Sequence, residues 1–272
     1  MKSVAMGQYY AADSPLHRLD ARTKVILAVV YIVISFLCKN TIGFALLLAS
    51  GMFLILISKV PMKLVIRALK PIFIIMLITV FINIFMTSGD TLLLHWRFIR
   101  IYKEGIYNAA FMAIRIIILI VGASVFLTYT TTPINLTDAI ERLLLPLKKI
   151  KVPVHEFAMM MTIALRFIPT LVDETDKIMS AQKARGASFD NGSLIKRAKA
   201  LIPILIPLFV SSFRRADELA TAMESRCYHG GNGRTKMTVT HMRFSDIAAM
   251  IAMTVFGTAI VLLNIYGVGY TM

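Results

Sequence analysis

The chain has 272 residues, a net charge of +15 and a mean hydropathy of +0.73. Hydrophobic residues make up 57% of it and charged residues only 17%, whereas a soluble domain has roughly 45–50% apolar and about 25% charged residues. A disordered tail, a collagen and a disulfide scaffold are excluded. The composition predicts an integral membrane protein whose charges lie in loops or in a separate basic region.

Five apolar runs predict the membrane part. They cover Val25–Cys38, Thr41–Ser58, Pro71–Thr87, Ile106–Thr128 and Ile247–Val268. A helix needs about 20 residues to cross the hydrocarbon core, and the last two runs meet that length. The first two are short and separated only by Lys39 and Asn40, so they indicate either a tight hairpin through the bilayer or two buried helices that do not fully span it. We therefore expect an all-α membrane protein with about five membrane-embedded helices.

Positive charge predicts the orientation, because cytoplasmic loops are rich in Lys and Arg. Residues 1–24 and 59–70 hold four Lys or Arg each, and residues 129–246 hold 17. We expect the N-terminus and the segment 129–246 to be cytosolic in a bacterial-type plasma membrane. The first 24 residues contain no apolar core, so no cleavable signal is expected. The expected domains are a membrane bundle over 1–128, a cytosolic region over 129–246 and a final membrane helix over 247–272.

One charge falls inside an apolar run. Arg115 is the tenth residue of Ile106–Thr128, where a basic group costs roughly 2.5–3.5 kcal/mol on insertion scales. It could line an ion or substrate path, or it could face the bundle and bond to carbonyl oxygens.

The segment 129–246 is predicted to contain two long amphipathic helices. The first covers His155–Arg185, and the second covers Leu194–Tyr228 and is expected to be broken by Pro203 and Pro207. Their apolar faces are too hydrophobic for helices that are free in solution. The charged residues among them are too many for the helices to span a membrane. We expect them to lie along the membrane surface or against partners.

Methionines accompany these apolar faces, at Met159, Met160, Met161, Met179 and Met223. Flexible thioether side chains suit surfaces that accept more than one partner. Ordinary core filling is an equally open interpretation for any single one.

The two predicted helices end alike. The first closes on Ala184-Arg185-Gly186 and the second on Ser225-Arg226-Cys227. An Arg in the last turn complements the helix dipole, and a following Gly is a common C-cap, so each ending alone could be purely structural. Its occurrence at both helices favours a binding role, because an exposed guanidinium can hold a carboxylate bidentately in an acidic groove.

No motif indicates catalysis by this chain. The five histidines and two cysteines are scattered without metal-ligand spacing, and there is no nucleophile elbow or phosphate-binding loop. An intramembrane enzyme and a transporter that works alone remain the alternatives. The charge follows predicted membrane edges, where anionic lipid explains it better than nucleic acid does.

Ordered motifs along nearly the whole chain resemble the transmembrane T component of energy-coupling factor transporters. They begin with Gly7-Gln-Tyr-Tyr and Asp13-Ser-Pro-Leu-His-Arg-Leu-Asp-Ala-Arg-Thr-Lys24, continue with Arg166-Phe-Ile-Pro-Thr-Leu171 and Ala181-Gln-Lys-Ala-Arg-Gly186, and end with Pro207-Leu-Phe, Arg215-Ala-Asp-Glu-Leu-Ala220 and Ala222-Met-Glu-Ser-Arg-Cys-Tyr228.

This resemblance implies a subunit that couples two ABC-type ATPases to a separate membrane protein, the S component, which binds a vitamin or another micronutrient. ATP and magnesium would then be bound by the ATPases, and no cofactor by this chain. In the family, two Ala-Arg-Gly motifs dock into the ATPases, which implies that role for Arg185 and Arg226. The second motif departs from the pattern at Ser225 and Cys227. Because Cys lacks the conformational freedom of Gly, the end of that helix is open to question.

Overall fold

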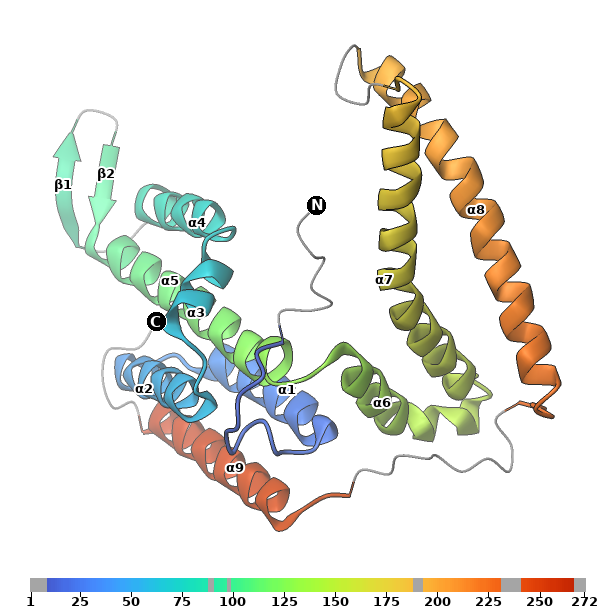
Figure 1. Ribbon diagram of the computed structural model, residues 1–272. Coiled ribbons are helices and arrows are strands. Elements are labelled where there is room, and N and C mark those ends of the chain that lie inside the picture. The colour runs from blue at the N-terminus through green and yellow to red at the C-terminus, as the bar shows by residue number, and fades with distance from the viewer. Residues whose placement is uncertain (1–8, 88–90, 97–98, 188–192, 231–240, 267–272) are drawn as a thin grey trace. The chain divides into compact units, whose positions relative to one another are not determined.

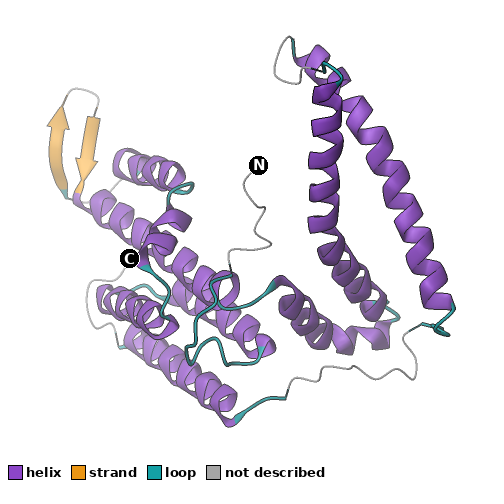
Figure 2. Cartoon of the chain, viewed as in Figure 1, coloured by secondary structure: helices purple, strands orange, loops and turns teal. Residues whose placement is uncertain are grey.

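The computed structural model describes residues 9–87, 91–96, 99–187, 193–230 and 241–266. Figure 2 shows that helices dominate. The helices are α1 (Ala21–Leu37), α2 (Thr41–Ser58), α3 (Met62–Leu69), α4 (Phe73–Met86), α5 (Lys103–Ala123), α6 (Pro133–Leu144), α7 (Val154–Ala184), α8 (Leu194–Glu224) and α9 (Phe244–Ile265). The chain divides into two compact units, residues 7–139 with 240–272, and residues 140–239 with 1–6. We call them the membrane bundle and the helix-pair unit.

The membrane bundle is built around α5, which packs against α1, α2, α3 and α4, while α9 packs on α1 and α2. Its core contains large side chains that are almost fully buried, among them Tyr31, Phe44 and Phe126. Gly122 on α5 lets α1 approach closely, because a Cβ there would lie 2.4 Å from Cδ1 of Tyr31. The absence of a side chain at residue 122 thus allows the backbone of α5 to pack against the Tyr31 ring of α1.

Within the part of the chain that the structure describes, three helical segments are each long and apolar enough to cross a membrane: α2, α5 with its π-helical continuation to Tyr129, and α9. A fourth span is possible if α3 and α4 count as one, although they are bent by 59° at the break between them. α1 has 17 residues. The all-α membrane class is confirmed, and the number of spans stays a prediction.

Buried charges tie the ends of the bundle's helices together. Asp246, at the start of α9, is fully buried and accepts hydrogen bonds from the backbone N–H of Asp20 at 2.8 Å and of Arg243 at 2.7 Å. Lys24, in the first turn of α1, donates hydrogen bonds from its ammonium group to the carbonyl oxygens of Thr130 at 2.7 Å and His17 at 3.1 Å. The bond between Asp20 and Asp246 joins segments 226 residues apart in the sequence, and the bond between Lys24 and Thr130 joins segments 106 residues apart.

Arg115 bonds within the bundle. Its guanidinium donates to the carbonyl of Cys38 at 3.0 Å and lies 5.3 Å from the centre of the Phe44 ring. A carbonyl acceptor and a ring face both favour the cation. The interpretation as a bundle-facing arginine therefore fits its contacts.

A short hairpin interrupts the helices between α4 and α5. β1 (Leu92–Trp96) pairs antiparallel with β2 (Ile99–Tyr102) in the register Trp96 with Ile99 and His95 with Arg100. The predicted apolar runs stop at Thr87 and resume at Ile106, and no strand is predicted between them. The β-branched and aromatic residues of this stretch, as in Ile99-Arg-Ile-Tyr, were the available signal.

The helix-pair unit consists mainly of α7 and α8, which run in opposite directions (Figure 1). The expectation that Pro203 and Pro207 break the second helix was wrong, because α8 is one continuous helix of 31 residues. The prolines are four positions apart, so both missing N–H donors fall on one face of the helix. The hydrogen-bond ladder continues on the other face.

Candidate functional site

The end of α7 is a complete Schellman cap. The N–H of Gly186 donates to the carbonyl of Lys183 at 3.0 Å, and the N–H of Ala187 donates to that of Gln182 at 3.0 Å. Gly186 has φ +87°, the left-handed conformation that this motif requires. Arg185 is thereby fixed at the last position before the chain reverses.

The end of α8 has the same hydrogen bonds. The N–H of Cys227 donates to the carbonyl of Glu224 at 2.9 Å, and the N–H of Tyr228 donates to that of Met223 at 3.1 Å. Cys227 has φ +56° and so takes the glycine position with a side chain present. The two helix ends therefore have one geometry despite their different residues, and Arg226 occupies the position that Arg185 has on α7.

All six residues of the two motifs are exposed: Ala184, Arg185, Gly186, Ser225, Arg226 and Cys227. α8 alone is about 46 Å long at 1.5 Å per residue. Because α7 and α8 are antiparallel, the two arginines lie at opposite ends of the pair (Figure 1). The unit thus presents two separate guanidinium groups, each beside the negative end of a helix dipole.

An ionic contact holds the two helices together away from their ends. Glu174 of α7 accepts hydrogen bonds from the hydroxyl of Ser211 and, at 2.8 Å, from the guanidinium of Arg215 on α8. The Ser211 hydrogen bond and the positive charge of Arg215 lower the pKa of Glu174 below its ordinary value. Sequence reasoning missed this pair. The signal was a carboxylate at position 174, on the apolar face between Leu171 and Ile178.

A second contact fixes the start of α7. Nδ1 of His155 lies 2.9 Å from Oε1 of Glu141, whose side chain is 8% exposed. Glu141 belongs to α6, and the short 3-10 helix Leu145–Ile150 connects α6 to α7. Both ends of α7 are thus defined by specific hydrogen bonds.

The methionines differ in exposure. Met160 and Met161 are 52% and 53% exposed, and Met159 and Met179 are half-buried. Large apolar residues are also exposed on α8, including Phe209 and Phe213 at 61% and 68%. The helix-pair unit therefore carries apolar surface that its own side chains leave uncovered.

Within the described residues, no three His, Cys, Asp or Glu side chains are grouped so as to hold a metal ion. Cys38 is buried and Cys227 is exposed, and both are free thiols.

The apolar bundle and the helical pair define an all-α, multi-pass membrane protein. The sequence profile of the family described as Cobalt transport protein, CbiQ, matches residues 12–238. Proteins named "Energy-coupling factor transporter transmembrane protein EcfT" are also similar. That of Clostridium kluyveri is 54% identical over 92% of this chain and 93% of its own. That of Ruminiclostridium cellulolyticum is 53% identical over 97% of this chain and 98% of its own. That of Acidaminococcus fermentans is 51% identical over 87% of this chain and 88% of its own.

The chain therefore belongs to this family, the transmembrane T components of energy-coupling factor transporters. It is a transmembrane component of a transport complex.

Proposed function

We propose that this chain is a non-catalytic scaffold and coupling subunit, which transmits the motion of ATP-hydrolysing partners to a separate substrate-binding membrane protein. The observation that carries the proposal is the repeated cap. Two helices end in the same Schellman geometry, each with an exposed arginine at the same position. A purely structural cap would not require arginine at both ends.

The partners at the two ends are two ABC-type ATPase subunits. Each arginine enters an acidic groove, where its planar fork bonds a carboxylate bidentately. The antiparallel arrangement supports two docking events, because Arg185 and Arg226 are too far apart to enter one groove. ATP and magnesium are bound by the ATPases, and this chain binds no cofactor.

The third partner is a membrane S component that holds a vitamin or another micronutrient. The exposed apolar surface of the helix pair supports this contact, with Met159, Met160, Met161 and Met179 as candidate contact residues on α7. Flexible methionines can repack against different partners. Rigid helices that join both contacts can carry a rigid-body displacement from one to the other.

In this arrangement the N-terminus and the helix-pair unit face the cytosol of a cell whose plasma membrane holds the bundle. The distribution of Lys and Arg supports that orientation.

The test is ATP-driven uptake in membranes that contain the whole complex. Arg185→Glu combined with Arg226→Glu is expected to abolish uptake and leave insertion of the chain intact, because a carboxylate repels an acidic groove. The matched control is Lys196→Glu with Arg214→Glu, which reverses two exposed charges on α8 outside the caps. Normal uptake by the first double variant would refute the proposal and favour a stand-alone transporter or an intramembrane enzyme.

A further inference from the structure

The short helix α3 carries its charges on one side. Val65 is buried against the bundle, whereas Lys63, Arg67 and Lys70 are exposed. The spacing 63, 67, 70 places the three cations on one face of the helix. Among the described residues, none of the three forms an ion pair with a carboxylate. Three positive charges therefore gather on one exposed helix face of the bundle.

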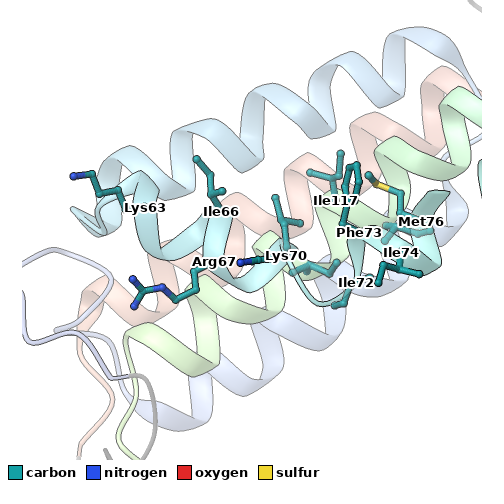
Figure 3. A pocket seen from close by; sticks show the side chains of 12 residues that line it. Lys63, Ile66, Arg67, Lys70, Ile72, Phe73, Ile74, Met76 and Ile117 are labelled. Atoms are coloured by element: carbon teal, nitrogen blue, oxygen red, sulfur yellow. The ribbon is translucent and has the colours of Figure 1, made fainter. Parts of the chain in front are cut away.

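A groove of about 740 Å³ lies beside these charges, between α3, the start of α4 and the C-terminal half of α5. The helix break at Pro71, with its bend of 59°, opens the space between α3 and α4. Apart from the cations, its lining is entirely apolar: Ile66, Leu69, Ile72, Phe73, Ile74, Met76, Ile116, Ile117 and Ile120. In Figure 3, Lys63 and Arg67 lie toward one end, and Phe73, Met76 and Ile117 toward the other.

The apolar end is also uncovered. Ile66, Phe73 and Ile74 are 60%, 55% and 67% exposed. Such a surface is stable beside hydrocarbon but costly beside water. An occupant that satisfies both ends must combine a compact negative charge with a long apolar tail.

We propose that this groove binds one anionic phospholipid of the surrounding bilayer. The headgroup phosphate lies among Lys63, Arg67 and Lys70, and an acyl chain runs past Ile66 and Phe73 toward α5. Charge complementarity and the continuous apolar lining select this occupant, because each cation near a membrane surface favours anionic lipid roughly fivefold. The inference does not depend on the coupling role proposed above.

The experiment measures which lipid contacts the groove. The chain has a single tryptophan, Trp96, so Trp96→Phe combined with Phe73→Trp places the only indole in the groove lining. The protein is reconstituted in vesicles of equal phosphatidylglycerol and phosphatidylcholine, with either one or the other lipid brominated on its acyl chains. Quenching of the indole then reports the relative occupancy of the two lipids.

We expect phosphatidylglycerol to be preferred at least tenfold. In the same background, Lys63→Gln, Arg67→Gln and Lys70→Gln together should reduce the preference to below twofold. The control removes three exposed lysine charges from the helix-pair unit, through Lys149→Gln, Lys196→Gln and Lys199→Gln, and should keep the preference.

Equal quenching by both lipids would overturn the proposal, as would an equal loss of preference in both triple variants, which would indicate a general charge effect. Absence of quenching by either lipid would also overturn it, because a protein surface would then cover the groove. Native mass spectrometry gives a second readout: the parent protein should retain one phosphatidylglycerol, and the groove variant should not.

Discussion

Replacing Cys227 by glycine should strengthen the end of α8. The residue has φ +56°, a conformation that costs a residue with a Cβ about 1–2 kcal/mol and glycine almost nothing. Glycine also has more freedom in the open chain, which offsets roughly 0.5–1 kcal/mol of the gain. The net stabilisation of the cap is therefore about 0.5–1 kcal/mol, or a twofold to fivefold lower population of the frayed end.

Hydrogen exchange measures this directly, because the amides of Cys227 and Tyr228 donate the two hydrogen bonds of the cap. Exchange of the peptide that contains residues 222–230 should slow about twofold to fivefold in Cys227→Gly. The reciprocal change, Gly186→Ala, should speed exchange at the end of α7, where an added Cβ meets no atom within 4 Å, so only backbone strain is introduced. Unchanged or faster exchange in Cys227→Gly would refute the claim that both helices share one cap geometry.

Two further perturbations test the contacts that hold each unit together. Asp246→Ala should lower the stability of the membrane bundle by about 3 kcal/mol or more, since two backbone N–H groups lose a charged acceptor. Thermal unfolding in detergent measures this loss, and the exposed Asp217→Ala is the control. An equal loss of stability in both variants would contradict the role given to Asp246. The pKa of Glu174 lies below its ordinary value of 4.5, so its contribution to stability is complete above about pH 4.5 and is lost as the pH falls through the lowered pKa. Thermal unfolding between pH 3 and pH 7 should show this loss, and Glu174→Gln should flatten the dependence of stability on pH. An equally steep dependence in the variant would contradict the role of Glu174.

The sequence predicted both helix ends to within four residues, because their signal is local: α7 ends at Ala184 where Arg185 was predicted, and α8 ends at Glu224 where Tyr228 was predicted. A small residue, an arginine and a glycine after an amphipathic run define a cap within a few positions. The departure at Cys227 left its geometry open, since no propensity predicts that a cysteine takes a positive φ. The surrounding hydrogen bonds of Glu224 and Met223 hold it there.

Features that depend on contacts between distant residues were harder to predict. α8 stays helical across Pro203 and Pro207 because the other backbone hydrogen bonds of this 31-residue helix outweigh the loss of the two N–H donors that the prolines lack. The contact between Glu174 and Arg215 joins residues on two helices, and periodicity alone gives no such pairing. In the same way, the bend near Pro71 could be expected, but not the groove that it opens.

The central claim is that each arginine-capped helix end binds one ATPase subunit. The most direct measurement is purification of the tagged chain from its native membranes in mild detergent, with quantification of the proteins that remain bound. The account predicts two ABC-type ATPase subunits and at least one small membrane protein with the wild-type chain. Arg185→Glu or Arg226→Glu alone should each lose one ATPase, and the pair should lose both while the membrane partner remains. A chain that is purified alone, or one that retains both ATPases in the double variant, would contradict the account.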